Sequence, residues 1–142
     1  AGAMLADSSE KSADKLGLFA AEIGVAFQIV DDVLDVTGNP HMTGKKVGLD
    51  LEEGKPTLPI IYAMEHETYG RDLASLFRKK GLSEEEKDRA IELIKSTDSL
   101  DRCLARAQSA ADKALKYLSG IPESEYKESL KLLAQYTVSR DR

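Results

Sequence analysis

The fold is decided by residues 16–36, which read LGLFAAEIGVAFQIVDDVLDV. From Ser8 to Val36, apolar residues recur every three or four positions, which is the period of one buried face of an α-helix. These positions are Leu16, Phe19, Ile23, Phe27, Val30 and Leu34. Between Ile23 and Val30, only Gln28 is strongly polar. The stretch therefore predicts one long helix whose second half lies inside a helical bundle.

Downstream of this helix, the pattern breaks from Thr37 to Thr57, where four glycines and two prolines predict a long irregular connection. Five further helices follow it, expected at about 57–64, 71–80, 83–94, 98–118 and 124–139. Thr57 is suited to cap the first of them, and Ser83 with Glu86 has the spacing of a capping box for the third. Because no segment alternates with period two, we expect an all-α bundle, organised as a single helical domain over 1–142.

The composition excludes several classes of protein. The net charge is −5, with 20 basic and 25 acidic residues interspersed along 142 positions, so no basic field points to nucleic acid as a partner. No apolar run is long enough to span a membrane, and the first residues lack the basic region of a signal peptide. The single cysteine, Cys103, fits a reducing compartment. These features predict a cytoplasmic protein.

Three carboxylates stand at the end of the long helix. Asp31 and Asp35 are one turn apart on one face, and Asp32 is about 100° round the axis. A solvated acidic face is the alternative interpretation. However, burying acids among apolar neighbours costs several kcal/mol each, and acids near a helix C-terminus oppose its dipole at roughly 0.3–1 kcal/mol each. A hard cation resolves both problems, and oxygen ligands indicate Mg²⁺, which commonly bridges carboxylate to phosphate.

The following loop suits an anion of this kind. Lys45, Lys46 and Lys55 lie among its glycines, which permit close backbone approach while the lysines supply point charges. The spacing differs from that of a Walker loop. Together with the aspartates, the loop indicates a diphosphate ligand.

These residues match the pattern of a known family. The run GVAFQIVDDVLD at 24–35 is followed by Gly44-Lys45, Gly48, Asp50-Leu51, Gly54-Lys55 and Thr57-Leu58-Pro59. This combination resembles the trans-isoprenyl (polyprenyl) diphosphate synthases, specifically their second aspartate-rich motif with its lysine loop. The ending YTVSRDR at 136–142 is also similar, so the resemblance extends over the whole chain. It implies the C-terminal part of an isoprenoid-synthase helical bundle.

The resemblance also implies roles for individual residues. Asp31, Asp32 and Asp35 would hold Mg²⁺ against the isopentenyl-side or allylic diphosphate, with Asp31 the direct ligand. Other implied roles are substrate or metal-water contact for Gln28, allylic diphosphate binding and leaving-group stabilisation for Lys45 and Lys55, and support of the site for Asp50. The implied reaction ionises an allylic diphosphate, adds isopentenyl diphosphate to the cation and releases pyrophosphate.

The chain departs from the family in what it lacks. The first aspartate-rich motif and the upstream helices are missing, and residue 1 falls within what reads as a helix already under way. We therefore expect the C-terminal piece of a complete enzyme, working as a homodimer or heteromer. A noncatalytic or complementing subunit and a class I terpene cyclase are the alternatives, although the segment from Gly44 to Pro59 argues against a cyclase.

Overall fold

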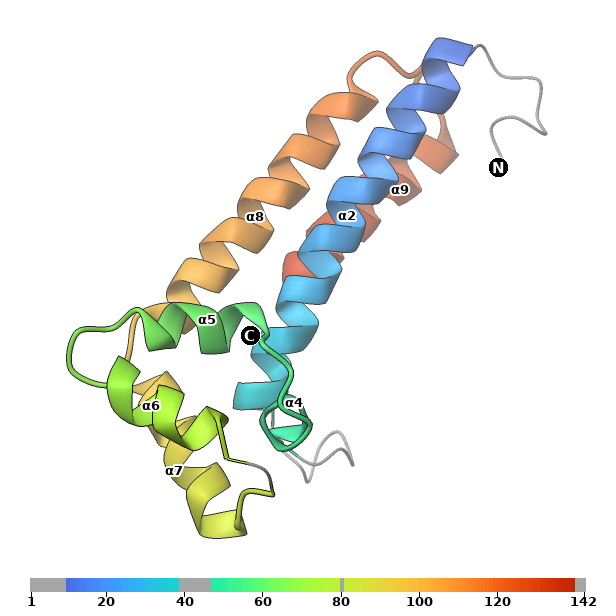
Figure 1. Cartoon of the computed structure of the whole chain (residues 1–142). Helices are drawn as coiled ribbons and strands as arrows, with labels where there is room; N and C mark the ends of the chain where they lie inside the picture. The colour runs from blue at the N-terminus through green and yellow to red at the C-terminus, as the bar shows by residue number, and fades with distance from the viewer. Residues whose placement is uncertain (1–9, 39–46, 80, 140–142) are drawn as a thin grey trace. The chain divides into compact units, whose positions relative to one another are not determined.

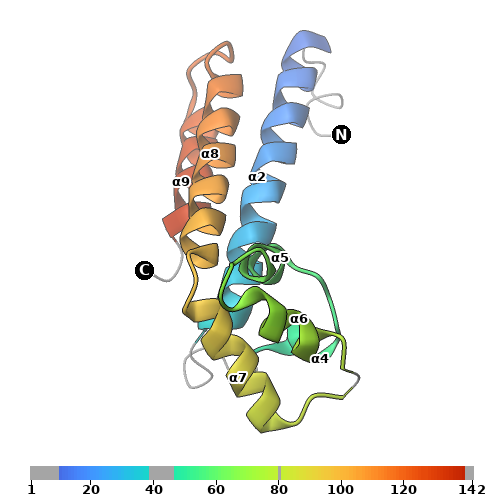
Figure 2. The ribbon, with the colours of Figure 1, turned by 60° about the vertical axis from the view of Figure 1, so that its left-hand side comes forward.

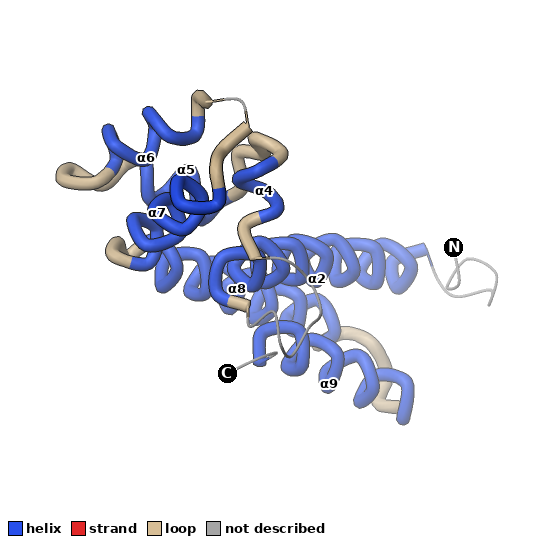
Figure 3. Tube along the Cα trace, turned by 90° about the horizontal axis from the view of Figure 1, so that it is seen from below, coloured by secondary structure: helices blue, strands red, loops and turns tan. Residues whose placement is uncertain are grey.

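The computed structural model describes residues 10–38, 47–79 and 81–139, in which every regular element is a helix and none is a strand (Figure 3). The helices are α2 (Glu10–Thr37), α4 (Leu49–Glu52), α5 (Leu58–Met64), α6 (Gly70–Phe77), α7 (Glu84–Lys95), α8 (Ser99–Leu118) and α9 (Glu125–Ser139), as labelled in Figure 1. The all-α prediction is confirmed. None of the helices within these ranges is long and apolar enough to cross a membrane.

The helices form two compact units. The first contains the described parts of 1–30 and 106–142, so it combines most of α2 with most of α8 and all of α9, which lie side by side in Figures 1 and 2. Its core consists of Phe19, Ile23, Ala114, Leu118 and Ala134. The long helix is thus as predicted, and Phe19, Ile23 and Val30 of the predicted face are buried, whereas Phe27 is exposed.

One expectation about α2 is wrong. Its second half was predicted to be enclosed all round, yet Val25 is 47% exposed and Phe27 is 46% exposed. Within this unit α2 packs against α8 and α9, and these two helices cover only part of its circumference. The helix period therefore identified the buried side at Phe19 and Ile23, but the side that carries Val25 and Phe27 is exposed.

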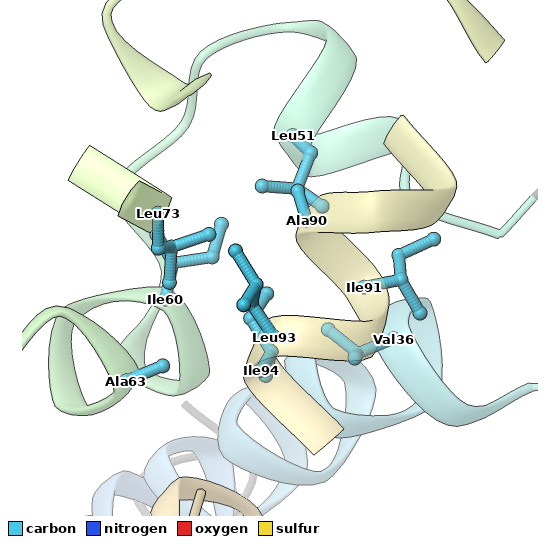
Figure 4. Close-up of a cluster of buried hydrophobic side chains, with 9 residues drawn as sticks. All are labelled: Val36, Leu51, Ile60, Ala63, Leu73, Ala90, Ile91, Leu93 and Ile94. Carbon is cyan, nitrogen blue, oxygen red and sulfur yellow. The ribbon is translucent and has the colours of Figure 1, made fainter. Parts of the chain in front are cut away.

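The second unit contains residues 31–105 and has a core of its own (Figure 4). Its buried residues are Val36, Leu51, Ile60, Ala63, Leu73, Ala90, Ile91, Leu93 and Ile94. They come from the last turns of α2 and from α4, α5, α6 and α7. The end of the long helix is therefore packed on the short helices that follow the loop.

Local sequence signals explain how two of the short helices begin. At α7, the Ser83 hydroxyl accepts from the Glu86 amide and the Glu86 carboxylate accepts from the Ser83 amide, both at 3.2 Å, so the predicted capping box is confirmed. At α5, Thr57 occupies the cap position, but its hydroxyl makes no capping bond. The Thr57 oxygen is buried and has no hydrogen-bond partner among the described residues. The prediction of a Thr57 side-chain cap is therefore wrong, and Pro59 in the first turn is the remaining start signal.

Replacing Ser83 with alanine is expected to lower the free energy of unfolding by about 1 kcal/mol, because the Glu86 amide loses its capping acceptor. Urea denaturation of the two proteins measures the difference. Ser75→Ala is the matched control, since Ser75 is exposed within α6 and its loss should change stability by less than about 0.5 kcal/mol. Equal effects of the two substitutions would contradict a capping role.

Candidate functional site

The three aspartates at the end of α2 differ in their exposure. Asp31 is exposed, Asp32 is buried with 9% of its surface accessible, and Asp35 is partly buried. The expected burial of the carboxylates is therefore confirmed for Asp32 and wrong for Asp31. The reason is helical geometry, because a step of about 100° turns Asp32 into the packed side while Asp31 stays outside.

Asp35 is tied to the start of α4. The amides of Leu49 and Asp50 donate to its Oδ1 and Oδ2 atoms, each at 3.1 Å. The Gly48 amide donates to the backbone carbonyl of Asp35 at 2.8 Å. Desolvation raises the pKa of Asp35, and the negative charges of Asp50 and Asp31 act in the same direction, whereas the two amide hydrogen bonds lower it. Asp35 thus lies in a local field of like charge.

Gly48 is required where it stands. Its φ of 76° lies in the left-handed region, and a Cβ there would approach Cδ1 of Ile91 to 3.0 Å and Cγ of Lys87 to 3.2 Å. Lys87 is buried on α7, with its ammonium 2.7 Å from Glu84 and 3.9 Å from Glu52 at the end of α4. The short helix is therefore held between α2 and α7.

Lys55 follows α4 and lies among acids. Its Nζ is paired with Glu53 and lies 3.7 Å from Oδ1 of Asp50, and its side chain is 58% exposed. The Glu53 carboxylate raises the pKa of Lys55, so the ammonium is charged at neutral pH. The Lys55 amide also donates to the Asp50 carbonyl at 2.8 Å. The predicted residues Asp50 and Lys55 are therefore brought together.

Two other predicted residues are not placed in this group. Gln28 is an exposed residue of α2 within the first unit. Lys45 lies at 39–46, outside the described residues. Glu53 also belongs to this group and was not predicted. Its position two residues before Lys55 is the sequence feature that could have indicated it.

The carboxylate oxygens at the end of α2 fit a hard divalent cation. The side chains at this end of α2 offer carboxylate oxygens, and Asp31 and Asp50 both add to the negative field at Asp35, which a cation would relieve. Across the described ranges, no three His, Cys or acidic side chains are placed to hold a metal by themselves. This arrangement suits a divalent cation that takes one or two protein carboxylates and completes its shell with water or an anionic ligand.

Cys103 does not compete as a metal ligand or nucleophile. It is fully buried on α8, and this burial, with the charge of Asp32 adding to it, raises the pKa of the thiol to about 12. A thiol of this kind stays protonated at neutral pH. Cys103 is therefore a buried, structural residue.

Comparison with known proteins identifies one family. A family model described as polyprenyl synthetase matches residues 1–94. The octaprenyl diphosphate synthase of Haemophilus influenzae is 40% identical over 99% of this chain, and component 2 of the heptaprenyl diphosphate synthase of Geobacillus stearothermophilus is 36% identical over 99% of it. In both cases the chain spans 43% of the relative's length.

A solved structure gives the same result for the fold. The geranylgeranyl pyrophosphate synthase of Corynebacterium glutamicum, crystallised with calcium and isoprenyl diphosphate, superposes with a TM-score of 0.88 at 34% identity. The match covers 98% of this chain and 43% of that structure. The described helices therefore have the fold found in a part of that synthase.

Proposed function

Because the chain belongs to the polyprenyl synthetase family, we propose that it forms the C-terminal part of an enzyme that condenses isopentenyl diphosphate with an allylic diphosphate and releases pyrophosphate. The observation that carries the proposal is the group at the end of α2, where Asp31, Asp35 and Asp50 lie within electrostatic reach of one another and Lys55 lies beside Asp50. Such a group can bind a metal diphosphate from the acidic and the basic side at once.

We propose Asp31 as the direct ligand of Mg²⁺, with Asp32 and Asp35 completing the acidic group. Asp31 is the exposed member and therefore the one that a solvent-borne ion can reach. Bound Mg²⁺ would supply positive charge to the departing pyrophosphate oxygens. Lys55 and Lys45 would add charge to the same leaving group, and Gln28 would contact substrate or metal-bound water.

The test is incorporation of labelled isopentenyl diphosphate into a longer prenyl product by the complete enzyme that contains this chain. We expect product and pyrophosphate only when both an allylic diphosphate and Mg²⁺ are present, with loss of turnover on adding EDTA and recovery on restoring Mg²⁺. A cyclic hydrocarbon formed from the allylic diphosphate alone would contradict chain elongation and support a terpene cyclase.

A heteromeric enzyme is a second candidate, favoured by the similarity to a protein named as one component of a heptaprenyl diphosphate synthase. In that arrangement this chain would complete a site together with a partner polypeptide. Turnover that appears only when a second, different chain is added would support it over a homodimer.

A further inference from the structure

Asp35 makes contacts that a metal ligand does not need. Its backbone carbonyl and its two carboxylate oxygens accept hydrogen bonds from three consecutive amides, those of Gly48, Leu49 and Asp50, at 2.8, 3.1 and 3.1 Å. The partners are 13 to 15 positions away in sequence. Two of these bonds go to the carboxylate, and hydrogen bonds to an ionised acceptor are about twice as strong as neutral ones. The three bonds together hold residues 48–50 against the last turns of α2.

The contacts continue from Asp50 to Lys55. The Asp50 carbonyl accepts from the Lys55 amide at 2.8 Å, and its carboxylate lies 3.7 Å from the Lys55 ammonium. Gly54, with a φ of 66°, turns the chain between them. The Lys55 charge is therefore connected to the end of α2 through Asp50 and the bonds that Asp35 makes.

We propose that Asp35 is a positioning residue, which holds residues 48–50 against α2 and thereby sets the distance between the acidic group and Lys55. This inference rests on the proposed function for its consequence, but the contact itself can be tested without turnover. It assigns Asp35 a role different from that of Asp31, which is exposed one turn earlier on the same helix.

The first measurement is amide hydrogen exchange of the 142-residue chain. Asp35→Asn keeps the side-chain size but leaves a single carbonyl oxygen for two amides, so we expect the Leu49 and Asp50 amides to exchange about tenfold faster. Asp31→Asn, the matched control, should leave both rates within about twofold. Unchanged exchange within α9 reports that the variant is folded. Equal rates at Leu49 and Asp50 in the two variants would overturn the proposal.

The second measurement separates positioning from metal binding in the complete enzyme. We expect Asp35→Asn to raise KM for the allylic diphosphate about tenfold, while the Mg²⁺ concentration for half-maximal rate rises much less than in Asp31→Asn, because Asp35 adds charge to the group without being the direct ligand. Asp31→Asn should instead raise that Mg²⁺ concentration. An equal Mg²⁺ shift in both variants would overturn a positioning role. If Asp31→Asn leaves the Mg²⁺ dependence unchanged while Asp35→Asn speeds exchange at the Leu49 and Asp50 amides, the proposed metal site is wrong and the positioning role of Asp35 stands.

Discussion

Asp31→Ala in the complete enzyme is expected to lower kcat by about 10³-fold, which corresponds to ~4 kcal/mol of lost transition-state stabilisation. Ionisation of an allylic diphosphate places new negative charge on the leaving group, and fixed cations must meet that charge. Asp31 is the exposed carboxylate of the group, so its removal takes away a metal ligand without opening a cavity in either core.

Steady-state turnover at saturating Mg²⁺ and substrates measures the effect. Asp112→Ala is the control, because Asp112 is also an exposed helical aspartate, hydrogen-bonded to Gln108. It lies on α8, outside residues 31–57, which contain the candidate site. The control should keep turnover within about twofold, since exposed polar contacts contribute little. Near-normal turnover of Asp31→Ala would remove the metal role assigned to Asp31.

The sequence predicted elements that rest on local rules. The period of Phe19 and Ile23 identified the buried face of α2, and the spacing of Ser83 and Glu86 identified the start of α7. In each case the deciding interactions lie within one helix or between neighbouring turns. Such interactions can be read without knowing where the rest of the chain lies.

The features that were missed depend on contacts between segments far apart in sequence. The one-turn helix α4 lies within what was expected to be an irregular loop, and its first amides are held by Asp35 from 14 and 15 positions away. Likewise, nothing in the spacing of the aspartates tells that Asp31 is exposed while Asp32 is buried near Cys103. The sequence therefore named Asp35, Asp50 and Lys55, which the structure brings together, but it indicated neither Glu53 nor the different exposure of the aspartates.

Loss of Lys55, the lysine of the proposed site, is expected to have the second large effect on turnover. Lys55→Ala in the complete enzyme is expected to lower kcat/KM for the allylic diphosphate by about 10²-fold, because a charged contact to the transferring diphosphate is lost. Lys113→Ala is a close control, since both lysine side chains are 58% exposed and both are paired with a glutamate. Surface ion pairs of that kind contribute about 0–1 kcal/mol, so kcat/KM of the control should stay within about twofold.

A substitution that is expected to strengthen substrate binding tests the same role of Lys55. In the structure Lys55 is paired with Glu53, so an incoming diphosphate must compete with that carboxylate for the ammonium. Glu53→Gln removes the competing charge and should lower KM for the allylic diphosphate by about twofold to fivefold, with the gain reduced at high ionic strength. If Lys55 served only to hold its own loop in place, losing Glu53 would loosen the loop and raise KM instead. The direction of this one change therefore decides whether the Lys55 charge acts on the substrate or on the protein.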